Sequence, residues 1–253
     1  MMQRVLVTAG AAGIGLATAR CFATAGAKVH VADIDADALS HVAAQHESIT
    51  GTHADISKPG DVARIFEDIE RDLGGLDVLV NNAGISGPTS PVAEFDLAAW
   101  QTVLDVNLTG TMMVTQRAIP LLIQSAQASI VIMSSLAGRF GYANRSVYAT
   151  TKWGLVGFAK TLALELGEHG ITCNTIHPGA VEGERIRHVF EGRMKLSGRS
   201  MEEERALGMQ NQSIKRFTDP GDIAELIRFL AGPHARTISG QSFPIDGDSK
   251  AAQ

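Results

Sequence analysis

The chain contains only two tyrosines, and one of them, Tyr148, is followed four residues later by Lys152. On a helix, residues four apart lie on the same face, one turn from each other. An ammonium close to a phenol favours the phenolate and lowers the tyrosine pKa from its usual value of about 10. The spacing therefore predicts a general acid or base that works near neutral pH.

Serine hydroxyls precede this pair in the chain. The apolar, β-branched run Ser129–Ser134 predicts a strand, so Ser134 and Ser135 lie at its carboxyl end. A hydroxyl at that position could donate a hydrogen bond to a substrate carbonyl oxygen on which negative charge develops. A tyrosine–lysine spacing alone often arises by chance, but chance does not readily explain a serine placed upstream of it at a strand end.

A glycine-rich segment, Thr8–Gly15, connects the first predicted strand to the first predicted helix. Small residues let a pyrophosphate approach the backbone, and the start of a helix offers unpaired N–H groups and a positive dipole end. The position of the segment in the first β-α unit predicts a dinucleotide site. The alternative is a tight connecting turn without a ligand.

Asp33 ends the second predicted strand. A carboxylate there can accept hydrogen bonds from the adenosine ribose and would repel a 2′-phosphate. We therefore expect NAD as cofactor, with NADP less favoured. The alternative for Asp33 is to cap the following helix, but Asp35 could fill that position instead.

Short strand-like runs alternate with helical patterns along the whole chain. The predicted strands are Arg4–Thr8, Lys28–Asp33, Ile49–Ala54, Asp77–Asn81, Ser129–Ser134, Ile171–Ile176 and Gln241–Ile245. The predicted helices are Gly13–Ala25, Asp35–His46, Asp61–Leu73, Asp96–Gln124, Tyr148–Gly167, Glu182–Gly208 and Asp219–Leu230. This alternation predicts a single-domain, doubly wound α/β fold over residues 1–253: a seven-stranded parallel sheet with helices on both faces. We expect a substrate lid at about residues 181–213.

The composition narrows the classes of partner and compartment. A net charge of -5 argues against nucleic acid as a partner, and no segment is long and apolar enough to predict a membrane span. Two cysteines, Cys21 and Cys173, are expected to be unreactive thiols, which fits a reducing cytoplasm. The histidines have no metal-site spacing, so we expect no metal.

In their order along the chain, these motifs resemble those of the short-chain dehydrogenases/reductases of the classical type. The matching motifs are Thr8–Gly15, Asp55-Ile56, Asn81-Asn82-Ala83-Gly84, Asn107, Ser135, Tyr148-x-x-x-Lys152 and Pro178-Gly179. The resemblance covers essentially the whole chain. It implies a Rossmann-type fold, a homotetramer, and an NAD(P)-dependent alcohol dehydrogenase/reductase acting on a small-molecule alcohol or ketone.

The resemblance also implies roles for individual residues. Tyr148 would donate or accept the proton, Lys152 would bind the nicotinamide ribose and lower the tyrosine pKa, and Ser135 fits the catalytic serine better than Ser134. Asn107 would hold a water linked to Lys152, or else bridge backbone groups. The implied cofactor-binding residues are Gly10, Ala12, Gly13, Ile14, Gly15, Asp33, Ile34, Asp55, Ile56, Asn82, Ala83, Gly84, Tyr148, Lys152, Pro178, Gly179 and Val181. Asn82 could alternatively hold the strand end.

Two positions depart from the family pattern. Its first glycine is replaced by Ala9, so either the turn tolerates alanine or Gly10 takes the permissive backbone conformation. Gly183 stands where many members have a threonine that contacts the carboxamide of the cofactor.

The substrate is expected to be a sugar, polyol, hydroxy acid or steroid-like compound, selected by the lid together with Ser86, Leu136, Tyr142 and Asn144. One alternative is an NADPH-dependent reductase of 3-oxoacyl thioesters. Another, from a different class, is a non-catalytic nucleotide-binding regulator.

Overall fold

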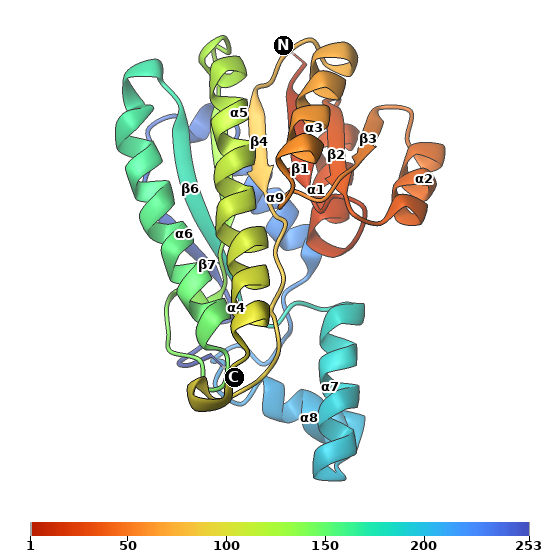
Figure 1. Cartoon of the computed structure of the whole chain (residues 1–253), viewed down its shortest axis with the longest axis vertical. Helices are drawn as coiled ribbons and strands as arrows, with labels where there is room; N and C mark the ends of the chain where they lie inside the picture. Colours follow the sequence, from red (N-terminus) through yellow and green to blue (C-terminus); the bar gives the residue numbers. More distant parts are fainter. Residues whose placement is uncertain (1, 253) are drawn as a thin grey trace.

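The computed structural model describes residues 2–252, and its centre is one parallel sheet of seven strands in the order β3-β2-β1-β4-β5-β6-β7 (Figure 1). The strands are β1 (Arg4–Thr8), β2 (Lys28–Asp33), β3 (Ile49–His53), β4 (Val78–Asn81), β5 (Ser129–Met133), β6 (Thr172–Pro178) and β7 (Ser242–Ile245). Every neighbouring pair runs parallel. The predicted seven-stranded parallel sheet is confirmed. The strand order changes direction between β1 and β4, the position at which such sheets bind ligands.

Helices cover both faces of the sheet (Figure 1). Apolar residues of α1 (Gly13–Thr24), α2 (Ala36–Gln45) and α9 (Pro220–Leu230) pack on one face. Those of α3 (Pro59–Asp72), α5 (Thr111–Ile123) and α6 (Ser146–Glu165) pack on the other. Successive side chains of a strand point to opposite faces of the sheet, and β1 has apolar residues on both. Val5 and Val7 pack with α1, α2 and α9, whereas Leu6 packs with α3, α5 and α6. The predicted doubly wound Rossmann-type domain is therefore the observed fold.

The predicted helix Asp96–Gln124 consists of three consecutive segments. α4 (Leu97–Leu104) leads into a π-helical turn, η2 (Asp105–Gly110), and α5 follows directly. Turns of the π type are rare and are frequently found at functional sites. The shorter 3-10 turns are η1 (Val92–Glu94), η3 (Leu136–Gly138), η4 (Gly167–His169) and η5 (Pro233–Ala235).

The segment predicted as one helix over Glu182–Gly208 forms two, α7 (Glu184–Ser197) and α8 (Met201–Gly208). Gly198 ends α7 in the left-handed conformation with φ 71°, and Ser200 starts α8 with a capping box to Glu203. The prediction that this segment is helical is confirmed, but the prediction of one continuous helix is wrong. The left-handed Gly198 ends the first helix, and the capping box at Ser200 begins the second. Both helices project from the sheet (Figure 1).

None of the helices within residues 2–252 has the length and apolar character needed to cross a membrane.

Candidate active site

The ends of β1 and β4 meet at the point where the strand order reverses. There the side-chain amide of Asn82 donates to the carbonyl oxygens of Thr8 and Ala9, both at 3.0 Å. The hydroxyl of Thr8 in turn accepts from the backbone N–H groups of Asn82 and Ala83, also at 3.0 Å. Asn82 therefore has the strand-holding contacts that the sequence left as an alternative, while its surface lines the pocket described below.

The glycine-rich turn shows which residue takes the strained conformation. Ala9 has φ 50°, in the left-handed region, so the turn tolerates alanine and the alternative that Gly10 takes this conformation is wrong. Gly10 is needed for another reason, because a Cβ there would lie 2.6 Å from Cγ1 of Val31. A Cβ on Gly15 would lie 2.0 Å from the carbonyl oxygen of Ala9. Close packing therefore requires glycine at both positions, since any side chain would clash.

The N-terminus of α1 fits a pyrophosphate. Its N-cap residue, Ala12, offers no side-chain hydrogen bond, and its first turn has no acidic residue. Gly13 is exposed with φ 51°, and nothing lies within 4 Å of the position that a Cβ would take. The N–H groups of this turn are therefore not capped by a side chain, and the helix dipole favours an anion there.

Asp33 lies beside this turn at the end of β2. Its Oδ2 accepts from the backbone N–H of Ala11 at 2.9 Å, and its Oδ1 accepts from that of Asp35 at 3.2 Å. Asp35, not Asp33, caps α2, because its side chain accepts from the N–H of Ala38 at 2.9 Å. Each oxygen of an ionised carboxylate has a second acceptor position, so Asp33 can still receive a ribose hydroxyl.

The two serines at the end of β5 have different surroundings. The hydroxyl of Ser134 is buried and donates to the carbonyl oxygen of Lys152 at 2.9 Å. Ser135 is half-buried, and its hydroxyl oxygen accepts from the N–H of Ala137 at 3.2 Å, which leaves its own hydrogen to donate. Ser135 is therefore the serine whose hydroxyl can serve a ligand.

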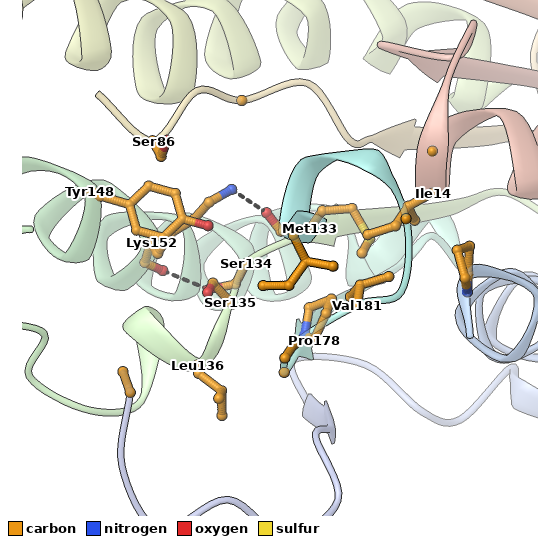
Figure 2. Close-up of a pocket in the computed structure, with 18 of the residues that line it drawn as sticks. Ile14, Ser86, Met133, Ser134, Ser135, Leu136, Tyr148, Lys152, Pro178 and Val181 are labelled. Atoms are coloured by element: carbon orange, nitrogen blue, oxygen red, sulfur yellow. Dashed lines mark hydrogen bonds between the residues drawn. The ribbon is translucent and has the colours of Figure 1, made fainter. Parts of the chain in front are cut away.

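Tyr148 and Lys152 lie on one face of α6, as the spacing predicts. The Lys152 ammonium lies 5.7 Å from the centre of the Tyr148 ring and donates to the carbonyl oxygen of Met133 at 2.8 Å. Figure 2 shows the polar ends of both side chains directed into the same space, near Ser135 and Met133. Lys152 is buried, which raises the electrostatic effect of its charge on neighbouring groups.

Asn107 is fully buried in the π-helical turn and bridges α6 to the loop after β4. Its Oδ1 accepts from the N–H of Ile85 at 2.8 Å, while its Nδ2 donates to the carbonyl of Ile85 at 2.9 Å and to Oγ1 of Thr151 at 3.0 Å. Asn107 therefore bridges backbone groups, which the sequence left as the alternative to holding a water. Gly84 separates Asn107 from Lys152, since a Cβ there would lie 3.3 Å from both side chains. The water that would link Asn107 to Lys152 stays a prediction.

His177 on β6 fixes the backbone of Ser135. Its Nδ1 is 3.0 Å from the carbonyl oxygen of Ser135, and its Nε2 is 3.0 Å from Oγ1 of Thr175. Burial lowers the pKa of His177, so its ring is neutral at pH 7 and Nδ1 can donate to that carbonyl. No role for this histidine follows from the sequence, because only the fold brings β6 beside the strand that ends at Ser135.

These groups surround a pocket of about 600 Å³. Among the expected site residues, those that line it are Ala12, Gly13, Ile14, Asp33, Asn82, Gly84, Ser135, Tyr148, Lys152, Pro178, Gly179 and Val181. Those outside the lining are Gly10, Gly15, Ile34, Asp55, Ile56, Ala83 and Asn107. Ile34 is largely exposed, whereas Ile56 is packed in the core. Gly183 has φ 145°, so a threonine there would be strained.

The pocket also has lining residues that the sequence did not single out as site residues. They are Met133, Arg145, Ala180, Pro220, Ser249, Ala251 and Ala252. Ser134, the second candidate serine, and Ala9 of the glycine-rich turn line it as well. From the expected lid, the lining also includes Glu182, Gly183, Glu184, Ile186, Phe190, Gly208, Asn211 and Gln212. Ser86, Leu136 and Tyr142, expected to influence substrate choice, line it too, whereas Asn144 does not. Gln212 is buried, and its Oε1 has no hydrogen-bond partner among the described residues, so a donor from a ligand or water would satisfy it.

Comparison with known proteins agrees with the geometry. Residues 9–247 match a family profile described as "Enoyl-(Acyl carrier protein) reductase". Galactitol 2-dehydrogenase of Agrobacterium fabrum is 34% identical over 244 residues, which span 96% of this chain and 95% of that protein. D-beta-hydroxybutyrate dehydrogenase of Cupriavidus necator is 34% identical over 250 residues, spanning 97% of this chain and 96% of the relative.

Solved structures show the same fold over nearly the whole chain. A variant of actinorhodin polyketide ketoreductase with NADPH has a TM-score of 0.92 at 30% identity, covering 97% of this chain and 96% of its own. NAD⁺-bound xylitol dehydrogenase has a TM-score of 0.90 at 27% identity, covering 97% and 98%. With the sheet order and the ordered motifs, these matches establish that the chain belongs to the short-chain dehydrogenases/reductases of the classical type, oxidoreductases that act on CH–OH groups with a nicotinamide cofactor.

Proposed function

We propose that this protein is an NAD-dependent dehydrogenase that oxidises a secondary alcohol of a small molecule to a ketone, in a reversible reaction. One observation carries this proposal: Ser135, Tyr148 and Lys152 line the same pocket as the open N-terminus of α1. A substrate carbinol between Ser135 and Tyr148 would thus lie beside a dinucleotide whose pyrophosphate sits at that helix.

In this proposal, Tyr148 is the group that moves the proton. As phenolate it takes the proton of the substrate hydroxyl during oxidation, and as phenol it returns it during reduction. Ser135 donates to the substrate oxygen, where negative charge develops, and Lys152 favours the phenolate and binds the nicotinamide ribose. The nicotinamide, when bound, accepts or supplies the hydride. Asn107 keeps α6 and the loop at Ile85 in register around this centre.

Asp33 supports NAD over NADP. It lines the cofactor end of the pocket, and the next two residues, Ile34 and Asp35, bring no cation that could neutralise a 2′-phosphate. The competing interpretation, a 3-oxoacyl thioester reductase, requires NADPH. Comparing kcat/KM for NADH and NADPH with one ketone distinguishes the two, and a preference for NADPH would contradict our proposal.

The segment between β6 and α9 covers the substrate end of the pocket in our proposal. Residues 181–213, which contain α7 and α8, form the substrate lid, since Ile186, Phe190 and Gly208 line the pocket from this segment.

The outer surfaces of α5 and α6 favour a homotetramer built through these helices, and light scattering would measure the oligomeric state. Four large apolar side chains are exposed there: Met112, Ile123, Trp153 and Leu164. Two free thiols, Cys21 and Cys173, favour a cytoplasmic location, which fractionation of the cells that produce it would check.

The decisive experiment removes one oxygen atom. Tyr148→Phe should leave NAD affinity nearly intact in a calorimetric titration. It should lower turnover by about 10²- to 10⁴-fold, the contribution expected of a positioned proton donor. NADH absorbance is followed with a panel of polyols, sugars, hydroxy acids and sterols. Tyr142→Phe, the other tyrosine of the pocket, is the comparison and should change kcat little. Retention of most activity by Tyr148→Phe would sink the assignment, and turnover of no substrate by the unaltered protein would favour a non-catalytic regulator.

A further inference from the structure

Arg145 stands where the substrate half of the pocket meets Tyr148. It is the residue directly before α6, one turn ahead of Tyr148, and it lines the pocket together with Ser86 and Tyr142. Residues three apart at the start of a helix are close neighbours. A group bound by Arg145 would therefore share the pocket with a carbinol bound at Tyr148.

The guanidinium of Arg145 is held in place before any ligand arrives. Its Nη1 donates to the carbonyl oxygen of Gly87 at 3.1 Å, and its Cζ lies 5.9 Å from the centre of the Tyr142 ring. The backbone of Arg145 forms a parallel bridge with Ser90, and its N–H donates to the carbonyl of Tyr142 at 3.2 Å. A preorganised guanidinium loses less conformational entropy when it binds a ligand.

The charges around the pocket leave Arg145 without an acidic partner. Glu182 accepts from Arg205 through both oxygens, at 3.0 and 2.8 Å, and Glu184 accepts from Arg187 at 3.5 Å. Asp33 lies at the cofactor end. Within residues 2–252, no carboxylate lies within 4.0 Å of the Arg145 guanidinium.

A half-buried cation with one carbonyl contact retains several unused N–H donors. The group that matches such a planar fork best is a carboxylate, which can accept two parallel hydrogen bonds. A neutral polyol would offer hydroxyl oxygens as acceptors, but neither the opposite charge nor the paired geometry of a carboxylate. We infer that Arg145 binds the carboxylate of the substrate and that the substrate class is a small hydroxy acid, oxidised to the oxo acid.

This inference rests on the proposed function and names the substrate class for the same site. Oxidation converts the carbinol CH–OH into C=O; the hydride leaves with the cofactor and the hydroxyl proton leaves through Tyr148. The carboxylate is unchanged in this step and stays on Arg145. Arg145 is therefore a specificity residue in this proposal and takes no part in the chemistry.

The experiment compares each hydroxy acid with its neutral methyl ester. Lactate, 3-hydroxybutyrate and 3-hydroxyhexanoate and their methyl esters are assayed with NAD⁺. For the unaltered protein, kcat/KM should favour the acid of the best pair. Arg145→Met should lower kcat/KM for that acid by about 30- to 100-fold, the loss expected for charged hydrogen bonds, and change kcat/KM for the ester less than about threefold. Arg145→Lys should retain part of the preference, since the charge stays but the fork is lost.

Arg228→Met removes the same charge from an exposed arginine of α9 that is not among the residues lining the pocket, and it should leave the acid-to-ester ratio unchanged. A structural role of Arg145 through Gly87 would lower acid and ester kinetics together in Arg145→Met, and that result would overturn the inference. Equal or better turnover of esters by the unaltered protein would overturn it as well, while the proposed dehydrogenase would stand.

A binding measurement separates the two proposals if turnover fails. The oxo acid acetoacetate and its methyl ester are titrated calorimetrically into the NADH-loaded protein. Binding of acetoacetate that Arg145→Met abolishes supports the anion site even if the protein oxidises no alcohol. Equal affinity for acetoacetate and its ester, or equal affinity in Arg145→Met, refutes the anion site whatever the activity.

Discussion

The hydroxyl of Ser134 donates to the backbone carbonyl of Lys152 at 2.9 Å, and this bond joins the end of β5 to the middle of α6. It connects the residue next to Ser135 with the residue that follows Tyr148 by one helical turn. The relative position of the three proposed functional side chains therefore depends on a serine that is itself buried and whose hydroxyl is held by a backbone carbonyl.

Exchanging each serine for alanine should separate stability from catalysis. Ser134→Ala leaves the Lys152 carbonyl without this donor, so the free energy of unfolding should fall by about 1 kcal/mol. Ser135→Ala loses only the 3.2 Å contact with the Ala137 N–H, so it should lower the stability less than Ser134→Ala does. It should lower kcat by about 10²- to 10³-fold, since it removes one donor to the developing oxyanion. Thermal denaturation and steady-state kinetics of both variants measure the difference. A Ser135→Ala variant with unaltered kcat would exclude our assignment.

Ala9→Gly should stabilise the protein. Ala9 adopts φ 50°, which costs an L-residue with a Cβ about 1–2 kcal/mol, and glycine removes this cost while making the unfolded chain more flexible. We expect a net gain of about 0.5–1 kcal/mol in the free energy of unfolding, measured by denaturant titration. Ala12→Gly in the same turn is the control, because φ there is -148° and glycine brings no relief. If both variants lose stability equally, the strain at Ala9 is not significant.

Asp33→Asn should weaken discrimination between the two dinucleotides. The amide keeps an oxygen for the Ala11 N–H but removes the charge that repels a 2′-phosphate, so the ratio of the NADP to the NAD dissociation constants should fall about tenfold or more. Asp35→Ala is the matched control: it removes the cap of α2, costs about 1 kcal/mol of stability and should leave the ratio unchanged. A ratio that stays constant in Asp33→Asn would contradict the ribose contact.

His30 should make the protein less stable in mild acid. It is fully buried on β2 between Thr50 and Thr52, and burial lowers its pKa to about 4 from 6.5, despite the attraction of Asp72. Below pH 6.5 the unfolded chain binds a proton at His30 that the folded protein does not, so stability falls as the pH drops from 6.5 to about 4. Between pH 7 and pH 5 the loss should be about 2 kcal/mol.

Denaturant titrations of the unaltered protein and of His30→Gln at both pH values test this prediction. The variant keeps a polar side chain but cannot titrate, so its stability should change clearly less between pH 7 and pH 5. Parallel loss in both proteins would assign the acid sensitivity to other groups.

The order of elements could be predicted from the sequence because each strand and helix has its own local signal. Apolar runs such as Val5–Val7 and the helical spacing of Val62, Ile65 and Ile69 are properties of short segments. The resemblance to the family favours Ser135 over Ser134, and the structure adds that the Ser134 hydroxyl donates to the Lys152 carbonyl. These features needed no knowledge of long-range contacts.

Other features arise only when distant segments meet. The contact of His177 with Ser135 requires β6 to lie beside β5. The ends of the segment proposed as the lid are held by the N–H groups of Glu182 and Ile214, which donate to the carbonyl oxygens of Thr218 and Gly247. The left-handed Ala9 also escapes prediction, because the sequence places a glycine next to it. Arg145 had a usable signal, a cation three residues before Tyr148 on the same helix end, but its lack of an acidic partner appears only in three dimensions.

The π-helical turn around Asn107 gives the long helical run one residue more than uninterrupted α-helical winding would need for the same path. Deleting a single residue between Asp105 and Gly110 would therefore relax the turn to ordinary winding while α5 keeps its orientation relative to α4. Val114, Ala118 and Leu122 would stay on the sheet, and the loss would fall on the contacts of Asn107 with Ile85. In an insertion–deletion scan, this stretch should keep the fold after a one-residue deletion, whereas the same deletion inside α5 would turn the apolar residues beyond it away from the sheet.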